Sequence, residues 1–542
     1  MYMNIWISKN NLGNALQKSK WTYKDLIIFS IPFLIFLFYL NIYNPGILTY
    51  DSFNQMHQIA SNEFTNWHPF FHTFIEMLCL KIYPSPISIA ILQILVFSTM
   101  WTIICNYTRV NDTSNKKFDK EFILQIIFTL FISIIPINAV YSITLWKDIL
   151  FSYFLMFLCF LIKVTIDKKG HLDYKFVISL SLVMAFVAHL RSNGLLFIGI
   201  VLIALCIYIY KKNKPQKLYI SIPTLTIIFI LLIASLNIVY DVEDNQKDAL
   251  FAKTAHLLSY DDLNLNLDAS DKKIIHEMIN ESSIKNDFNE TWSDPIYRAS
   301  NGQVFAENKG TYLGIAIKYA VKYPVSFITY LFESSPIVWD ITRDSDWAGK
   351  IIDTDTNGGN KMFYRSGVNV PLTSYDNATS INFGTTEYNM LESFVEYTQE
   401  NVELDTLLNS PAFYMYLAII MMLAIAILTK SRSIYLVYLP NFLNIMTVFF
   451  STPLQSNRYL YSNLLVLYLL VIILISAIFT YKKKDETNSQ NFPTKDNKEH
   501  DDYNQNVLIN KNQRKEQRIL EKSKISSINM EETHEEMKNR KY

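Results

Sequence analysis

Long apolar runs, separated by shorter polar stretches, dominate the chain. A helix needs roughly 20 apolar residues to cross the hydrocarbon layer of a membrane. About ten runs approach this length, and they are continuous instead of following the periodicity of a soluble core. We therefore expect an all-α polytopic membrane protein. The predicted spans are 26–43, 86–105, 122–141, 149–165, 176–190, 194–210, 218–239, 411–429, 433–450 and 461–480.

One polar stretch, 44–85, follows the first predicted span and is too long to be a simple turn. Residues 52–64 predict a short helix with Asp51 or Ser52 as its cap. Residues 69–83 predict a second helix with an apolar face. At this length the second helix lies along the membrane interface and does not cross.

A second polar stretch, 240–410, is rich in Asn, Asp, Ser and Tyr and is much too polar to span. We expect a mixed external domain here, with one amphipathic helix over 311–333. Residues 481–542 are charged and Asn-rich, which favours a disordered tail, with a helix over 506–523 as an open alternative. The other expected parts are an N-terminal segment (1–25), a seven-span module (26–239) and three C-terminal spans (411–480).

Lys and Arg in short loops indicate the orientation of a membrane protein. Loops 106–121, 163–175 and 211–217 each hold several of them, and Lys430 and Arg432 lie in a tight turn. With ten spans, all of these loops fall on the same side as both termini. We interpret that side as the cytoplasm of a cell-membrane protein and place the two long polar stretches outside.

The composition excludes several functions. The formal net charge is zero, with 50% hydrophobic and 18% charged residues, so no global charge favours nucleic acid as a partner. The four cysteines have the spacing of neither a zinc site nor a disulfide framework, and we interpret them as small apolar side chains. The sequence also lacks a Walker loop, a dinucleotide fingerprint, HExxH and GxSxG.

Three cations fall on the predicted external side, where the positive-inside rule disfavours them: Lys147, Arg191 and Arg458. Each has a local explanation, such as snorkelling for Lys147 or a tight turn for Arg191. Three cations on one face together point to an anionic ligand. The common anion in a membrane is a lipid phosphate or diphosphate, which Arg and Lys bind well.

Asp51 follows the first span directly, in the run Thr49-Tyr50-Asp51-Ser52. One role for it is to cap the next helix. Another is to act as a base that takes a proton from a sugar hydroxyl, which requires an ionised, accessible carboxylate. The two roles are compatible, because a capping carboxylate keeps a free oxygen.

Neighbouring polar residues extend the candidate site. His68 and His72 have the four-residue spacing of metal ligands, but no second carboxylate motif accompanies them. We therefore expect His68 to line the site without a metal or another cofactor. Asn193 suits a sharp turn between two spans. An aromatic-acid cluster over 339–344 fits a sugar contact and a surface turn equally well.

The order of these features resembles the GT-C class of membrane glycosyltransferases, which use polyprenyl-phosphate-linked sugars on the external face. The chain shares an acid after the first span, interfacial helices in the first external loop, a large external loop and a late Arg-Tyr motif. More narrowly, it is similar to a bacterial family called domain of unknown function 6020. The resemblance covers about residues 25–480, through Tyr50-Asp51-Ser52 with Gln55, His68-Pro69, Trp146-Lys147-Asp148, Arg191-Ser192-Asn193-Gly194 and Arg458-Tyr459.

The resemblance implies a GT-C-like bundle in which Asp51 is the general base or orients the acceptor. The expected reaction moves a sugar from a polyprenyl-phosphate donor to a cell-envelope glycan or lipid. Glu63 is the nearest second acid, which argues against a metal-dependent oligosaccharyltransferase-like mechanism. The predicted binding residues are Lys147, Arg191, Arg458, His68, Tyr459, Asn193 and Gln55.

Two non-catalytic functions remain as alternatives. A lipid-linked-glycan flippase or an envelope polysaccharide assembly factor would use the same phosphate-binding cations but would not need Asp51. A scaffold would instead depend on its tail, 481–542, to recruit cytoplasmic partners.

Overall fold

The computed structural model describes residues 21–109, 120–212, 218–244, 249–342, 382 and 384–490. Within these residues every regular element is a helix, and the remaining backbone pairing consists of three isolated β-bridges. Several predictions lie outside the described residues. They concern residues 1–20, residues 343–381 of the external region, and residues 491–542 of the tail with its candidate helix.

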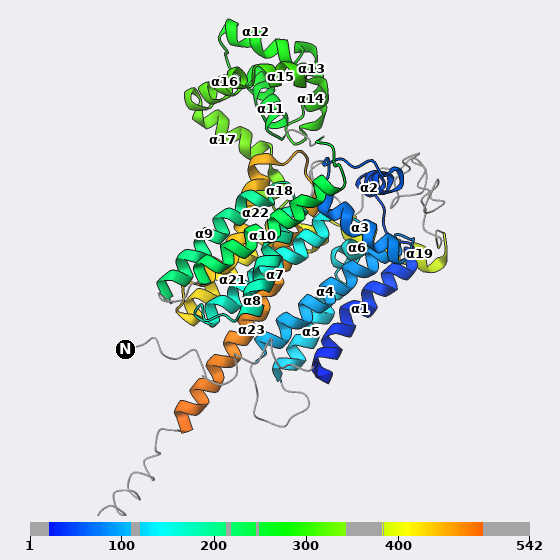
Figure 1. Ribbon diagram of the computed structural model, residues 1–542, viewed down its shortest axis with the longest axis vertical. Helices are drawn as coiled ribbons and strands as arrows, with labels where there is room; N and C mark the ends of the chain where they lie inside the picture. Colours follow the sequence, from blue (N-terminus) through cyan, green and yellow to red (C-terminus); the bar gives the residue numbers. More distant parts are fainter. Residues whose placement is uncertain are drawn as a thin grey trace, which may run out of the picture. The chain divides into compact units, whose positions relative to one another are not determined.

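Eight described helices are long and apolar enough to cross a membrane (Figure 1). Helices α5 (Lys120–Ile134) and α6 (Pro136–Ile143) make a ninth if they form one bent span, and α8 (Tyr174–Leu190) is a shorter apolar helix. Every predicted span is thus helical, and the chain is an all-α polytopic membrane protein. The eight are α1 (Tyr23–Ile42), α4 (Ile87–Thr108), α7 (Lys147–Asp167), α9 (Gly194–Lys212), α10 (Leu218–Val239), α21 (Pro411–Thr429), α22 (Ile434–Ser451) and α23 (Tyr461–Gln490).

Two predicted spans differ from regular crossing helices. The run predicted over 122–141 bends by 66° between α5 and α6. Pro136 is the first residue of α6, and proline disfavours the helical conformation in the residue before it. Helix α8 has 17 residues, fewer than the roughly 20 that cross the hydrocarbon layer without adjustment. The prediction of ten regular spans was therefore too simple.

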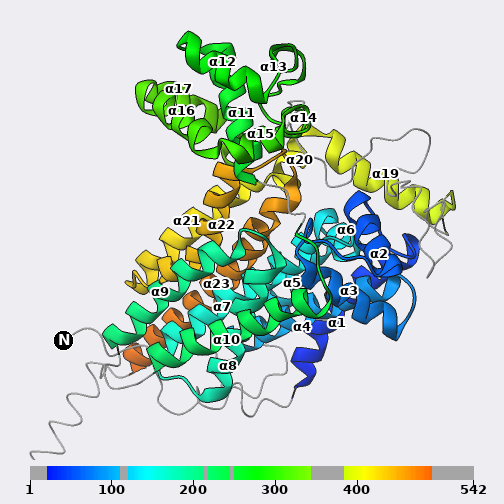
Figure 2. The ribbon, with the colours of Figure 1, turned by 45° about the horizontal axis from the view of Figure 1, so that its top comes forward.

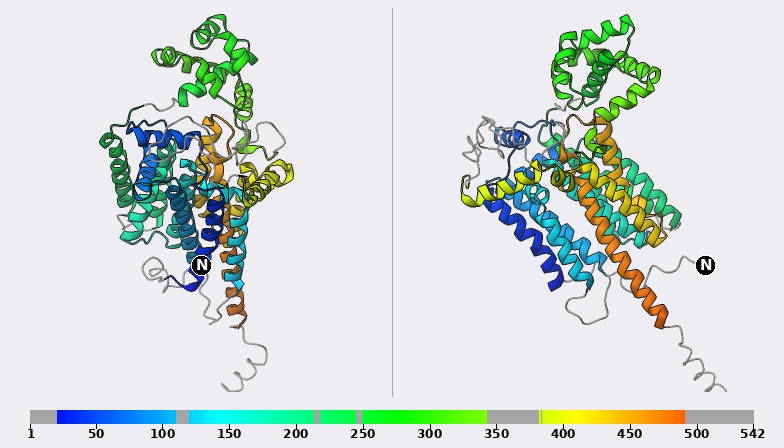
Figure 3. Two further views of the ribbon diagram at one scale, coloured as in Figure 1. Left: turned by 90° about the vertical axis from the view of Figure 1, so that its right-hand side faces the viewer. Right: turned by 180° about the vertical axis from the view of Figure 1, so that it is seen from behind.

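Helix α7 forms the centre of the bundle. Its apolar window is 83% buried, whereas that of α10 is 11% buried, so α7 is enclosed by protein and α10 presents most of its surface outward. Helix α7 packs against α4, α8 and α22. Helix α1 packs along α4 and α5, and α10 packs along α8 (Figures 1 and 3).

Hydrogen bonds join the helix ends that are predicted to be cytoplasmic. Asn106 at the end of α4 donates to Asp25 at the start of α1, at 2.8 Å. Tyr107 donates to Asp167 at the end of α7, at 3.2 Å. The Lys-rich loop after Asp167 therefore lies at this end, and Lys147 at the first turn of α7 lies at the other.

The first loop forms two helices, α2 (Tyr50–Ser61) and α3 (Phe70–Ile82), as the sequence predicted. The predicted cap was wrong. Thr49 is the cap, and its backbone N–H donates to Ser52 Oγ at 3.2 Å in a capping box. Asp51 lies in the first turn of α2, so its carboxylate is free for other contacts.

The described part of the external region is helical, not mixed. Its first helices surround a separate apolar core that includes Phe251, Leu258, Ile275 and Tyr312 (Figure 2). The core lies among α11 (Ala249–Asn264), α12 (Ala269–Met278), α13 (Glu281–Asp287), α14 (Asp294–Ala299), α15 (Gly302–Glu307) and α16 (Lys309–Lys322). The other helices of the region are α17 (Pro324–Glu333), α18 (Pro336–Trp339), α19 (Thr386–Glu400) and α20 (Val402–Asn409).

Two predicted boundaries in the polar regions change. The helix predicted over 311–333 ends at Lys322, and α17 starts at Pro324. Proline at the first position begins the new helix because it lacks the N–H that would continue the old one. At the C-terminal side, α23 continues through Gln490, ten residues into the segment predicted to be a disordered tail.

Candidate functional site

Asp51 lies where three segments distant in sequence meet: the first turn of α2, the start of α7, and the short 3-10 helix η1 (Asn457–Leu460). Arg458 Nη1 donates to Asp51 Oδ2 at 2.7 Å. Lys147 Nζ is 3.8 Å from the same oxygen. The Asp51 side chain is 21% exposed, so this ion-paired carboxylate remains accessible.

Backbone pairing holds the start of α2 against the start of α7. Leu145 N–H donates to Ile47 O at 3.1 Å, beside the Ile47–Thr144 bridge. Trp146 Nε1 donates to Thr49 Oγ1 at 2.6 Å. These contacts place Lys147 opposite Asp51 because each residue follows its anchored segment directly.

Aromatic rings fix the Arg458 guanidinium. It lies over the Trp146 ring at 4.7 Å and over the Tyr459 ring at 5.2 Å. Its Nη2 is 3.5 Å from the Tyr459 hydroxyl. Arginine stacks on aromatic faces while its edge stays available for carboxylate or phosphate, so this cation is preorganised.

Asp148 joins Arg191 to the cluster. Its side chain is fully buried, with Arg191 Nε 3.3 Å from Oδ1 and Arg458 Nε 3.9 Å from Oδ2. Lys147 Nζ is also 3.9 Å from Oδ2. A buried carboxylate needs such partners, because an uncompensated charge in a dry interior is very unfavourable.

Arg191 follows α8 directly and has its own supports. It donates to Tyr459 O at 3.0 Å and to Asn444 Oδ1 at 3.3 Å. Its guanidinium also lies 5.1 Å over the Tyr459 ring. Tyr459 therefore contacts both Arg191 and Arg458.

His68 completes the contacts around Asp51. Its Nδ1 is 3.2 Å from Lys147 Nζ, and its Nε2 is 3.7 Å from Asp51 Oδ1. Burial, together with the nearby Lys147, lowers the pKa of His68 to about 3, so the ring is neutral near pH 7. Because an ammonium can only donate, we infer that Nδ1 accepts and that Nε2–H faces Asp51.

The charges of the cluster do not cancel. Lys147, Arg191 and Arg458 face Asp51 and Asp148, and the neutral His68 adds no charge. Burial alone would raise the pKa of Asp51, but Arg458 and then Lys147 hold it well below its usual range. Asp51 is therefore ionised, and one positive charge remains in excess. Such a cluster favours an anion.

Two other predicted binding residues make contacts outside the cluster. Gln55 Nε2 is 3.0 Å from His72 Nδ1 and donates to Thr73 Oγ1 at 2.8 Å, so it links α2 to α3. Asn193 donates to Thr447 Oγ1 at 2.6 Å and links the start of α9 to α22. Both side chains fix the helices that carry the cluster.

The sequence placed Asp148 in the Trp146-Lys147-Asp148 motif but did not identify it as a member of the cluster. Trp146 holds the cap position, and Asp148 lies in the first turn of α7. The available signal was an acid directly beside a cation on the disfavoured face. Its partners Arg191 and Arg458 come from distant segments, which the sequence alone does not bring together.

The external region holds the segment that carries Arg458. Gln455 Nε2 donates to Thr291 O at 2.9 Å and to Ser334 O at 3.2 Å. Its Oε1 accepts from Ile337 N–H at 3.1 Å. The position of Arg458 therefore depends on helices of the external region as well as on the spans.

The other candidates from the sequence, a metal site and the aromatic-acid cluster over 339–344, gain no support from the described residues. Among the described residues, no group of three or more His, Cys, Asp or Glu is arranged to hold a metal ion. In the aromatic-acid cluster, Asp340 accepts from Thr342 of its own turn at 2.8 Å. Arg343 and Asp344 lie outside the described residues.

Fold and site together define a class of protein: an all-α multi-pass membrane protein with a partly buried, net positive acid–cation cluster at one end of its bundle. No protein-family model, curated protein or solved structure matched this chain in the comparisons. The similarity to GT-C enzymes stays a prediction from the sequence.

The lowered pKa values of His68 and His72 predict that each histidine contributes a loss of stability in mild acid. Glu76, 3.6 Å from His72, contributes in the opposite direction because burial raises its pKa. Burial, and then Lys147, lowers both pKa values to about 3, below the unfolded value of 6.5. As the pH falls below 6.5 the unfolded chain gains protons that the folded histidines do not. The free energy of unfolding then falls by at most about 1.4 kcal/mol per pH unit for each histidine.

Thermal unfolding in detergent at about pH 7 and about pH 5 measures this slope. The variant His72→Gln should show a smaller loss than the wild type. The control His57→Gln changes an exposed residue of α2 and should keep the full loss. Equal slopes for all three proteins would contradict the assignment of neutral, buried histidines.

Proposed function

We propose that this protein is a membrane glycosyltransferase that moves a sugar from a polyprenyl-phosphate donor to a cell-envelope acceptor at the non-cytoplasmic face. One observation carries the proposal. The accessible Asp51 carboxylate contacts Arg458 at 2.7 Å and lies 3.8 Å from Lys147, in a cluster with excess positive charge. An anion-binding group and a carboxylate base side by side suit transfer from a phosphate.

In the proposed reaction, Arg458 and Lys147 bind the donor phosphate. The bond between the sugar carbon and the phosphate oxygen breaks, and polyprenyl phosphate leaves with the bonding electrons. The acceptor oxygen forms the new bond to that carbon, and its proton passes to Asp51. Fixed cations stabilise the charge that grows on the leaving phosphate, which is usually a large part of catalysis.

The ion pair also suggests how the base is controlled. Without donor, Arg458 and Lys147 keep the pKa of Asp51 below its usual range, which makes it a weak base. A phosphate that binds both cations weakens their hold on the carboxylate, so the pKa of Asp51 rises. The base then gains strength when the donor is in place.

The alternative is a non-catalytic carrier of lipid-linked glycans. Intramembrane charges often mark the pathway of a transporter. In the described spans, Asp, Glu, Lys and Arg lie near or beyond the ends of the apolar segments, for example Lys147 at the start of α7 and Lys163 and Asp167 near its end. This distribution supports a transferase that works at one end of the bundle.

Proteoliposomes with the full-length protein and polyprenyl-phosphate-linked sugars separate the two functions. A transferase releases polyprenyl phosphate when an envelope glycan acceptor is added, and thin-layer chromatography detects this product for any sugar. A carrier instead moves the intact donor between leaflets and releases none. Release equal to that of protein-free liposomes, across a panel of donors, would contradict the proposal.

A further inference from the structure

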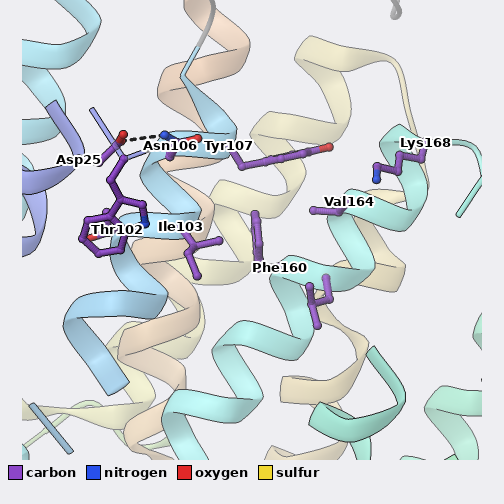
Figure 4. A pocket seen from close by; sticks show the side chains of 10 residues that line it. Asp25, Thr102, Ile103, Asn106, Tyr107, Phe160, Val164 and Lys168 are labelled. Atoms are coloured by element: carbon purple, nitrogen blue, oxygen red, sulfur yellow. Dashed lines mark hydrogen bonds between the residues drawn. The ribbon is translucent and has the colours of Figure 1, made fainter. Parts of the chain in front are cut away.

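A cavity lies at the end of the bundle opposite Asp51 and belongs to no part of the proposed reaction. Its volume is about 230 Å³. Helices α1, α4 and α7 form its walls (Figure 4). A single water needs only about 10–15 Å³ by such a measure, so this is space for a larger molecule. Its lining includes Trp21, Asp25, Ile103, Asn106, Phe160 and Lys168.

The cavity changes from polar to apolar along the helix axes. Lys168 and Asn106 lie toward one end in Figure 4, and Ile103 and Phe160 lie toward the other. On α7 the order from the apolar end is Phe160, Val164 and then Lys168 just beyond the helix. This is the polarity profile of a membrane interface, with charge at the helix ends and hydrocarbon below.

Lys168 is the only Lys or Arg among the described residues that line the cavity. Its side chain is 7% exposed, and its Nζ is 3.8 Å from Asp173, too far for a hydrogen bond. Asp173 accepts from Phe176 N–H at 2.9 Å as the cap of α8. Within the described residues, the Lys168 ammonium therefore has a long ion pair with Asp173 and the Phe176 ring at 5.1 Å, but no hydrogen-bond acceptor.

The carboxylates at the same end already have partners. Asp25 accepts from Thr22, from Asn106 and from Arg109, and the ion pair with Arg109 measures 3.4 Å. Asp167 accepts from Lys163 at 2.6 Å. Each of these two acids has its own cation, so the carboxylate that an incoming anion meets beside Lys168 is Asp173, which is 40% exposed and 3.8 Å from Nζ.

We propose that this cavity binds an anionic phospholipid of the adjacent leaflet, with its phosphate at Lys168 and an acyl chain along Ile103 and Phe160. Basic pockets between spans on the cytoplasmic side are a recurrent form of lipid site. Trp21, 51% exposed at the rim, suits the headgroup level. A free phosphate shares the headgroup chemistry but would leave the apolar half of the cavity empty.

Native mass spectrometry of the delipidated full-length protein in detergent, titrated with phosphatidylglycerol, tests this site. We expect one lipid bound more tightly than the rest. Lys168→Gln should weaken it about fivefold, the effect of one interfacial cation. The matched control Lys175→Gln removes an exposed cation in the first turn of α8 and should bind the lipid as the wild type does.

Two further arms identify the source of the phosphate. Ile103→Trp, or Val164→Phe if the first variant does not fold, fills the apolar half and should abolish the tight lipid while Lys168 remains. Excess glycerol phosphate should not displace the lipid. Equal binding by Lys168→Gln and wild type, equal losses for Lys168→Gln and Lys175→Gln, no effect of the filled cavity, or displacement by glycerol phosphate would each overturn the proposal. None of these outcomes depends on glycosyl transfer.

Discussion

Asp51→Asn will lower the rate of sugar transfer by about 10²–10⁴-fold, the usual contribution of a positioned general base. The same variant will bind polyprenyl phosphate more tightly than the wild type does. The physical reason is the 2.7 Å ion pair, in which the carboxylate competes with the donor phosphate for Arg458. Transfer is measured as polyprenyl phosphate release in proteoliposomes, and binding is measured by titration.

Opposite effects on rate and binding separate this role from a structural one. A variant that had lost its fold would lose both activities together. Glu63→Gln is the matched control, because Glu63 is an exposed acid of the same loop, and both quantities should stay at wild-type values. Unchanged transfer by Asp51→Asn would contradict the role of Asp51 as the base. Weaker phosphate binding would contradict the competition between Asp51 and the phosphate for Arg458.

Asp148→Asn will destabilise the protein by about 3–5 kcal/mol, the usual effect of removing one partner from a buried ion pair. Asp148 is fully buried between Arg191, at 3.3 Å, and Arg458, at 3.9 Å. Without its charge, the cations of the cluster face Asp51 alone. Thermal unfolding in detergent, followed by tryptophan fluorescence, measures the loss.

An added anion should partly reverse this effect. Inorganic diphosphate stabilises a folded state that binds it, so it should raise the melting temperature of Asp148→Asn more than that of the wild type. The control Glu281→Gln removes an exposed partner of Lys285 in the external region and should leave the melting temperature unchanged. If Asp148→Asn had the melting temperature of the wild type, the stability of the cluster would not depend on this carboxylate.

The helices were the most predictable part of the protein, because each span depends mainly on its own composition. Every predicted apolar run is helical, and the three cations that the loop charges assign to one side lie in one cluster. The effect of two prolines on the helix boundaries was not predicted. Pro136 and Pro324 each begin a new helix where the sequence prediction had continued one. The rule that proline disfavours a helical residue before it would have marked both breaks.

The site was less predictable, because its contacts join residues far apart in the chain. Asp51 meets Arg458, which is 407 residues away in sequence. Asp148 likewise pairs with Arg191 and Arg458, which come from distant segments. Thr49 took the cap of α2, where it also receives the Trp146 indole N–H, and so left the Asp51 carboxylate free. No local pattern contains this division of roles.

The central claim is that the acid–cation cluster binds a lipid phosphate beside a carboxylate base. The most direct test is an experimental structure of the full chain in lipid nanodiscs with polyprenyl phosphate. We expect the phosphate about 2.7–2.9 Å from Arg458 and Lys147. The pair of Arg458 with Asp51, now 2.7 Å, should be longer in that complex. A phosphate bound elsewhere, with this pair unchanged, would contradict the claim.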